Sequence, residues 1–419
     1  MKIFALIDCN NFYVSCERVF DPSLRKKTVV VLSNNDGCVV ARSQEAKKAG
    51  ITMGVPFFKI QPLIKKLGIR AFSSNYPLYA DMSSRVMNII GSSFPETEIY
   101  SIDEAFAEIS HFAFDIEHYC SQVRNKIYRC TGIPVSIGIG HSKTMAKIAS
   151  EIAKTQTSSD LFSFVHNSRT DTFLKNFPVQ DIWGIGRKTA SFLISKGIKT
   201  ALELKKSNPL YLRSKMGIHA VRIISELNDT PCYMLESNPP PSKTIRSSRS
   251  FPKPVNSKES LKEAISSFSS TAGLKLRKQK SRAGYLTVFL MTDRFKNDFK
   301  FLAKTIDFES PVNDDFSLVS ASVKGLDQIY SKSFSYKKAG IILGGISRES
   351  FNQMTFFNNK NIEKKEAVMK TFDEINNKFG RNALKISSCG INSPLDWQMK
   401  SEMRSPMYTT SWNDLPQAR

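Results

Sequence analysis

The first part of the chain alternates apolar runs with helically spaced stretches, in an order that predicts a split β-α-β-β-α-β unit. Residues 3–8 (IFALID) form an apolar run that closes on an acid, as a buried strand would. Residues 78–94 place Met82, Val86 and Ile90 at helical spacing. The remaining predicted elements are a hairpin with strands at 98–102 and 105–109, a helix at about 114–131, a strand at 133–140 and a helix at 142–154.

An insertion of about 24–80 separates the first strand from this helix. Within it, the apolar runs 28–33 and 38–43 flank Asn34-Asn35-Asp36-Gly37, which is a good hairpin signal. The insertion is therefore expected to contain a β-hairpin.

Three acids are predicted to meet at one edge of the main sheet. In the split arrangement the first strand lies beside the hairpin, so Asp8 approaches Asp103 and Glu104 despite their separation in sequence. Clustered carboxylates persist only when protons, cations or metal ions neutralise them. With no histidine or cysteine set nearby, oxygen ligands suit Mg²⁺, and two such ions could activate a hydroxyl and stabilise pyrophosphate. The alternatives are a loop of solvated acids and, less favoured, a glycosidase pair, since adjacent residues cannot flank a bond from opposite sides.

Charge adds a polyanionic partner to this picture. The 419 residues carry 60 basic and 38 acidic side chains, a net charge of +22, while residues 243–300 alone carry 14 basic and 4 acidic ones, a net of +10. Nucleic acid is the expected partner. No long apolar run, basic amphipathic helix or lipidation motif favours a membrane, and seven cysteines without a CxxC pair indicate reduced thiols.

The later part of the chain offers two candidate DNA contacts. The glycine turn with Gly184, Gly186, Arg187 and Lys188 suits a helix-hairpin-helix that presents amides to phosphate, or equally an ordinary helical corner. Beyond a Pro/Ser-rich linker at 236–248, an α+β module extends to about 350 and contains a basic run, predicted to track phosphates, of Lys275, Arg277, Lys278, Lys280 and Arg282. Residues 351–363 are expected to form a flexible tether.

Several long blocks carry a family resemblance. IDCNNFYVSCE (7–17), SNNDGCVVARSQEAKKAGITMG (33–54) and FSSNYPLYADMS (72–83) resemble Y-family translesion DNA polymerases. EIYSIDEAF (98–106), IGIGHSKTMAKIASEIAK (137–154) and DIWGIGRKTA (181–190) continue the match, and DWQMKSEMRSPMYTTSWNDLP (396–416) resembles the UmuC branch, the catalytic subunits of bacterial DNA polymerase V.

The resemblance implies an α+β multidomain fold shaped as a right-hand polymerase. It comprises a split βαβ (ferredoxin-like) palm, small fingers, a helical thumb with a helix-hairpin-helix, and an α+β little finger. The implied ranges are a palm of 1–23 and 81–170, fingers of 24–80, a thumb of 171–241, a little finger of 242–350, and a tether with a partner-binding tail of 351–419.

The resemblance also implies roles for single residues. Asp8, Asp103 and Glu104 take the positions of ligands to two Mg²⁺ ions, with the Cys9 carbonyl as a further ligand. Tyr13 falls at the steric gate under the nucleotide sugar, although without the motif it would read as a core aromatic. Lys154 matches a lysine that contacts triphosphate. The chain departs from a Tyr-x-x-Arg pattern in the fingers, which leaves Lys47 as a point charge and neighbouring Arg42 as a substitute contact.

The implied activity is error-prone, template-directed translesion synthesis in the SOS response, with primer–template DNA and deoxynucleotides as substrates. No segment remains for a proofreading domain, and small fingers would check base-pair shape loosely. The implied partners are a processed UmuD-like dimer, a RecA-type filament and the sliding clamp, in the bacterial cytoplasm at the nucleoid. The clamp contact would be QMTFF (353–357), with Gln353, Phe356 and Phe357, although chance aromatics could produce the same pentapeptide.

The residues by themselves leave two other classes of protein open. A nucleotide cyclase could use the same sheet and acids, but it would need neither a helix-hairpin-helix nor a +10 module. A non-catalytic DNA-binding scaffold would be favoured if an acid were missing, yet all three are present.

Overall fold

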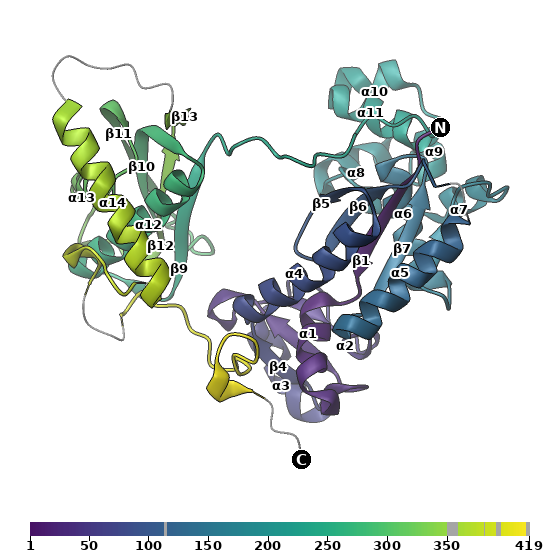
Figure 1. Ribbon diagram of the computed structural model, residues 1–419, viewed down its shortest axis with the longest axis horizontal. Helices are drawn as coiled ribbons and strands as arrows, with labels where there is room; N and C mark the ends of the chain where they lie inside the picture. The colour runs from purple at the N-terminus through teal and green to yellow at the C-terminus, as the bar shows by residue number, and fades with distance from the viewer. Residues whose placement is uncertain (113–114, 350–358, 381, 391–394, 416–419) are drawn as a thin grey trace. The chain divides into compact units, whose positions relative to one another are not determined.

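The computed structural model describes residues 1–112, 115–349, 359–380, 382–390 and 395–415, without the side chains of 359–363. The chain forms two compact units (Figure 1). Unit 1 comprises Met1–Pro239 and Glu402–Arg419, and unit 2 comprises Pro240–Ser401. The chain therefore leaves unit 1 at the Pro-rich linker and returns to it near its C-terminus.

The main sheet of unit 1 has the predicted split order. Its strand order is β5-β6-β1-β7-β8, and β1 (Phe4–Cys9) pairs antiparallel with both β6 (Glu104–Glu108) and β7 (Val135–Gly140). The outer strands are β5 (Glu96–Ile99) and β8 (Leu161–Ser163), and β8 was not predicted. The first hairpin strand ends at Ile99 instead of Ile102, because the amides of Tyr100 and Ser101 turn back to the Glu104 carbonyl.

Helices cover both faces of this sheet. One face packs against α4 (Tyr76–Ser93) and α5 (Ile116–Thr131), whose apolar stripes include Met82, Val86 and Val123. The short α1 (Phe12–Phe20) continues directly from β1. On the other face α6 (Lys143–Gln156) begins at Ser142, whose hydroxyl accepts from the Met145 amide as an N-cap.

Two glycines bring α6 unusually close to the sheet. A Cβ on Gly138 would collide with the backbone of Ala146 and Ser150, and one on Gly140 would lie 2.7 Å from the Met145 Cβ. Because α6 carries lysines toward the carboxylates, this close approach sets the reach of those side chains.

The insertion contains the expected hairpin within a three-stranded sheet, whose third strand was not predicted. β2 (Val29–Leu32) pairs with β3 (Val39–Arg42) through the predicted hairpin, and with β4 (Arg70–Ser73) in parallel. Its helices are α2 (Gln44–Lys48) and α3 (Phe57–Leu67).

A helical segment follows the main sheet and buries its own core around Leu174, Leu193 and Ile224. Its helices are α7 (Thr170–Asn176), α8 (Arg187–Ser195), α9 (Ala201–Lys205), α10 (Pro209–Met216) and α11 (Ile218–Leu227).

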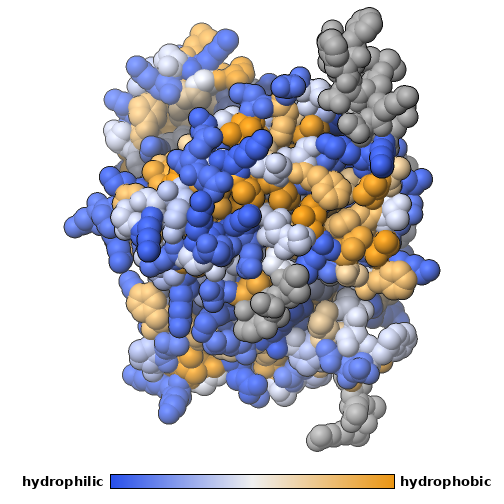
Figure 2. Space-filling model, turned by 90° about the vertical axis from the view of Figure 1, so that its left-hand side faces the viewer, coloured by the Kyte–Doolittle hydropathy of each residue, from blue (hydrophilic) through white to orange (hydrophobic). Residues whose placement is uncertain are grey.

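Unit 2 is built on an antiparallel sheet of order β11-β10-β12-β9. The strands are β9 (Ile245–Val255), β10 (Ser281–Met291), β11 (Phe301–Val312) and β12 (Tyr336–Gly344), with the short β13 (Ser347–Arg348) beside β10. Helices α12 (Lys258–Lys278) and α13 (Asp315–Ile329) pack on one face. Figure 2 shows hydrophilic side chains over much of the face in view, with hydrophobic ones gathered near the middle of that face.

The C-terminal part departs from the expected tether and tail. Helix α14 (Asn359–Phe379) begins inside the range predicted as a tether and packs on unit 2, where Met369 is buried. Unit 2 therefore continues past the expected boundary at 350, while the described residues 402–415 belong to unit 1. No helix in the described part of the chain is long and apolar enough to cross a membrane.

Candidate active site

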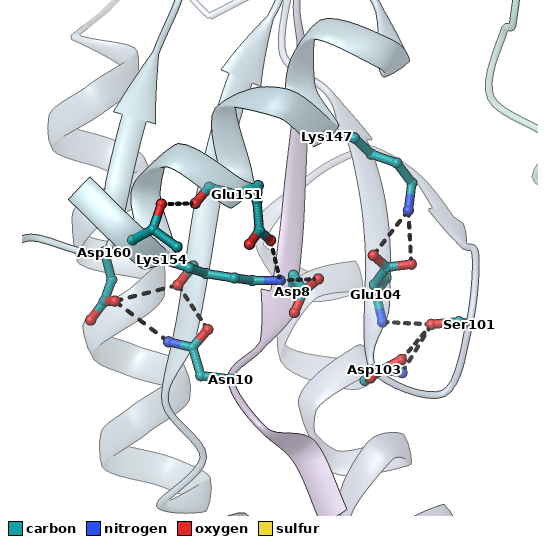
Figure 3. Close-up of polar contacts among 11 residues, drawn as sticks. Asp8, Asn10, Ser101, Asp103, Glu104, Lys147, Glu151, Lys154 and Asp160 are labelled. Atoms are coloured by element: carbon teal, nitrogen blue, oxygen red, sulfur yellow. Dashed lines mark hydrogen bonds and ion pairs between the residues drawn. The ribbon is translucent and has the colours of Figure 1, made fainter. Parts of the chain in front are cut away.

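The three predicted acids lie at one edge of the main sheet (Figure 3). Asp8, near the end of β1, is the direct register partner of Glu104, at the start of β6. Asp103 precedes Glu104, and its carbonyl accepts a 2.9 Å hydrogen bond from the Cys9 amide. The strand register therefore brings together residues that are almost a hundred positions apart.

Asp8 is neutralised by Lys154 of α6. The Lys154 Nζ lies 2.7 Å from the Asp8 carboxylate and 3.9 Å from that of Glu151. Burial raises the pKa of Asp8 to about 7, with the neighbouring Glu104 adding to the rise and Lys154 opposing it. Conversely, the Asp8 carboxylate raises the pKa of Lys154 although burial acts to lower it. Nearby positive charge therefore stabilises the ionised carboxylates of this site.

Glu104 is paired with a different cation, Lys147, which lies about two helical turns before Lys154 on α6. The Lys147 Nζ lies 3.0 Å from both Glu104 carboxylate oxygens. The same ammonium lies 4.6 Å from the centre of the Tyr100 ring. Sequence reasoning missed Lys147; the i, i+7 spacing with Lys154 on α6 was the signal that could have found it.

A cavity of about 500 Å³ opens beside these pairs. Asp8, Glu104, Lys147 and Lys154 line it, and Trp183 closes one side. Asp103 is absent from this lining; its Oδ1 accepts from the Ser101 hydroxyl at 2.6 Å, and its charge acts on Cys9 and Tyr13. Asp8 and Glu104 therefore line the cavity beside α6, whereas Asp103 does not.

The donor set suits a hard divalent cation once the lysines are displaced. Among the described residues no three acidic, histidine or cysteine side chains enclose a metal position as they stand, because Lys154 and Lys147 hold two of the carboxylates. The donors are all oxygens, since burial and the nearby carboxylates raise the pKa of the Cys9 thiol well above its usual range. A protonated thiol is a poor ligand, so Cys9 could contribute only its carbonyl.

Tyr13 is held by a stack of aromatic rings. It lies parallel to Tyr79 of α4, with ring centres 4.4 Å apart and planes 14° apart. Tyr76 meets it edge-on at 6.3 Å. The Tyr13 ring is half-buried, which fits a surface that supports a ligand as well as a core aromatic.

Arg42 and Lys47 belong to the small sheet and its following helix. Partial desolvation lowers the pKa of Lys47, and the charges of Arg42 and Lys154 lower it further. Arg42 donates to the Ile51 carbonyl at 2.6 Å, which leaves the rest of its guanidinium for another acceptor. Lys47 therefore lies within electrostatic range of both Arg42 and Lys154.

The predicted glycine turn is present. Gly184 has a φ of 86°, and Gly186 is the N-cap residue of α8. Gly184, Gly186, Arg187 and Lys188 are all exposed, so the N–H groups that begin α8 face solvent.

The basic run of unit 2 divides into two kinds of residue. Arg277 forms ion pairs with Asp315 and Asp373, each at 2.7 Å, and Arg282 is buried against Glu366. Internal carboxylates already bind the guanidinium groups of these two arginines, which does not favour the predicted contacts of Arg277 and Arg282 with DNA. Lys275, Lys278 and Lys280 are exposed.

Sequence reasoning also missed a basic group on the open face of this sheet. Arg246 of β9 and Lys338 of β12 lie on the face opposite α12 and α13, and Arg246 covers the Phe289 ring at 4.6 Å. Burial lowers the pKa of Lys338, and Arg246 and Arg294 add to the shift. The pairing of two strands brings these basic side chains together, so no run of basic residues in the sequence indicates the group.

The residues predicted to bind the clamp, Gln353, Phe356 and Phe357, lie outside the described residues.

The comparisons with known proteins agree with this geometry. A Y-family DNA polymerase chimera of Dbh and Dpo4 superimposes with a TM-score of 0.65 at 20% identity, covering 83% of this chain and 99% of that one. This likeness gives the fold, which is that of the Y-family DNA polymerases.

Sequence matches identify the branch. Residues 7–151 match the model of the impB/mucB/samB family, 242–356 its C-terminal domain, 167–198 the IMS family HHH motif, and 366–418 a domain of unknown function. Protein SamB of Salmonella typhimurium is 39% identical over 100% of both chains, and Protein UmuC of the same species is 37% identical over 99% of both. The chain belongs to the impB/mucB/samB family, the UmuC branch of the Y-family polymerases.

Proposed function

We propose that this protein is an error-prone translesion DNA polymerase of the SOS response, which adds nucleotides to a primer without proofreading. The observation that carries the proposal is the register of Asp8 with Glu104, each held by a lysine of α6. A carboxylate edge whose charge is balanced by displaceable cations suits a substrate that brings both metal ions and phosphates.

In this proposal Asp8, Asp103 and Glu104, with the Cys9 carbonyl, hold two Mg²⁺ ions. When bound, the ions would supply activation of the primer hydroxyl and stabilisation of the leaving pyrophosphate. Lys154, released from Asp8, binds triphosphate oxygens, and Lys47 and Arg42 add positive charge from the fingers. Tyr13 lies under the sugar and excludes a 2′-hydroxyl.

Primer extension tests the function as a whole. We expect Mg²⁺-dependent extension of a primer–template by the purified chain, together with any accessory dimer it requires, and none by Asp8→Asn. Because asparagine keeps the shape but loses the charge, a matching circular dichroism spectrum separates a lost ligand from a lost fold. Equal extension by Asp8→Asn would contradict the proposal.

Backbone contacts to DNA are proposed for two surfaces. The exposed amides at the start of α8 suit a phosphate, with Arg187 and Lys188 beside them. In unit 2 the exposed Lys275, Lys278 and Lys280 and the open sheet face with Arg246 and Lys338 offer positive charge.

Replacing Lys275, Lys278 and Lys280 with glutamine should weaken DNA binding independently of sequence. Each lost phosphate contact should lower the log–log salt slope by about 0.9 on duplex DNA, measured by fluorescence anisotropy. Lys262→Gln, at the other end of α12, should keep the original slope. An unchanged slope in the triple variant would mean that these lysines form a solvated face that does not bind DNA.

Arg277→Gln should instead lower the free energy of unfolding by about 3 kcal/mol, because it leaves buried Asp315 without its cation.

The partners implied by the family complete the proposal. Gln353, Phe356 and Phe357 would dock into the sliding clamp, and the C-terminal part would meet a processed UmuD-like dimer and a RecA-type filament. The chain would act in the bacterial cytoplasm, at the nucleoid. The family membership and the net charge of +22 support these contacts.

A further inference from the structure

The described C-terminal residues return to unit 1 and bind two of its parts (Figure 1). The Ser73 amide, at the end of β4, donates to the Met403 carbonyl at 3.0 Å, and the Met403 amide donates to the Ser73 hydroxyl at 2.9 Å. Tyr408 stacks on Phe20 of α1, with ring centres 4.8 Å apart and planes 5° apart. Residues 402–408, here named the strap, thus join the three-stranded sheet to the first helix of the palm.

A buried amide holds the middle of the strap. The Asn75 side chain is 0% exposed, and its nitrogen donates to the Ser405 carbonyl and hydroxyl and to the Pro406 carbonyl at 3.0 to 3.2 Å. Arg404 donates to the Asn75 oxygen at 3.3 Å. The side-chain amide of Asn75 forms its hydrogen bonds with the strap. Without the strap, these buried polar atoms would lack those partners.

The Ser405 hydroxyl connects the strap to a buried carboxylate. It donates at 3.0 Å to Glu17 of α1, and the Tyr79 hydroxyl donates to the same oxygen at 2.6 Å. Glu17 is 1% exposed, and none of the ion pairs among the described residues includes it. Burial raises the pKa of the Glu17 carboxyl, against the effect of the two hydroxyls. A carboxylate with two neutral donors is sensitive to the loss of either one.

The network ends at the ring under the proposed sugar site. Tyr79 is fully buried, its hydroxyl is fixed by Glu17, and its face supports Tyr13 at 4.4 Å. A shift of the Tyr79 ring therefore moves the surface on which Tyr13 rests.

We propose that Ser405 is a positioning residue for sugar selection, acting on Tyr13 through Glu17 and Tyr79. The inference rests on the proposed role of Tyr13 at the sugar. It gives the C-terminal segment a function within its own chain: the docked strap sets how strictly ribonucleotides are rejected.

A double-mutant cycle tests the proposal. Ser405→Ala should lower the preference for a deoxynucleotide over the matching ribonucleotide by about three- to tenfold, the range expected for the loss of one ordinary hydrogen bond. Tyr79→Phe keeps the ring but removes the other donor, and it should lower the same ratio. Because both act through Glu17, the double variant should lose less than the product of the two effects. Thr410→Ala, which removes an exposed hydroxyl just beyond the strap, should keep the original ratio.

The outcomes separate this inference from the function on which it rests. The ratio is measured by single-nucleotide incorporation, beside a melting curve, with Tyr13→Ala in parallel. If Tyr13→Ala relaxes sugar selection while Ser405→Ala and Tyr79→Phe do not, the strap has no part in it. A fall of both incorporation rates together with the melting temperature makes the strap purely structural and also overturns the inference. If Tyr13→Ala itself leaves the ratio unchanged, the proposed role of Tyr13 at the sugar is refuted, and with it the inference that depends on that role.

Discussion

Replacing Asp103 with asparagine or Glu104 with glutamine abolishes nucleotide addition and leaves primer–template binding almost unchanged: this is the largest effect we expect. Both side chains lie at the carboxylate edge, Glu104 as the partner of Asp8 and Asp103 beside the Cys9 amide. Charge stabilisation by bound metal is worth several kcal/mol, so the loss in rate should be on the order of 1,000-fold or more. DNA binding should persist, because the proposed phosphate contacts lie on α8 and in unit 2.

The measurement needs a control from the same sheet. Glu96→Gln changes an exposed carboxylate on β5 and should extend primers like the original chain. Mn²⁺ binding, measured by electron paramagnetic resonance, gives a readout other than activity. The affinity for Mn²⁺ should fall in Asp103→Asn and in Glu104→Gln but not in Glu96→Gln. Extension at an unchanged rate by either variant, with an intact circular dichroism spectrum, would remove that acid from catalysis.

Tyr13→Ala should keep measurable polymerase activity and accept ribonucleotides far better. The Tyr13 ring is fixed by the stack with Tyr79 and the edge of Tyr76, so it cannot easily swing away from a 2′-hydroxyl. Overpacking of this kind costs about 1–3 kcal/mol, which corresponds to roughly 5- to 150-fold in discrimination. Single-nucleotide incorporation with matched deoxy- and ribonucleotides measures the change.

A second tyrosine in the same unit serves as the comparison. Tyr128→Ala removes an exposed ring from α5 and should leave the sugar preference as it is. If Tyr13 were only a core aromatic, its loss would lower the melting temperature and both incorporation rates together. A stable Tyr13→Ala variant with the original sugar preference would refute the gate.

Local patterns were enough to predict the framework of the site. The apolar run ending at Asp8, the hairpin carrying Asp103 and Glu104, and the spacing of α4 and α6 are properties of short segments, so the split order could be read directly. The hairpin around Asn34-Asn35-Asp36-Gly37 was confirmed for the same reason. The short outer strand β8 escaped prediction because three residues carry too little periodicity to be recognised.

Charge partners were decided by the tertiary structure. The run from Lys275 to Arg282 has five basic residues in eight and no acidic one, yet Arg277 and Arg282 are paired internally because Asp315, Asp373 and Glu366 approach them from α13 and α14. The pairing of Lys147 with Glu104 likewise depends on how closely α6 approaches the sheet. A sequence states which charges exist, whereas the packing of distant segments determines which of them remain free to bind a ligand.

The sequence alone thus determined the order of the elements, the three acids and the polyanionic partner, because periodicity, motif spacing and net charge are encoded locally. The tertiary structure decided where the C-terminal residues belong. Nothing in residues 402–408 indicates that Ser405 meets Glu17, or that Tyr79 connects it to Tyr13. These contacts join positions that are 62 to 388 residues apart, and they exist only once the folded surfaces complement each other in shape and hydrogen bonding.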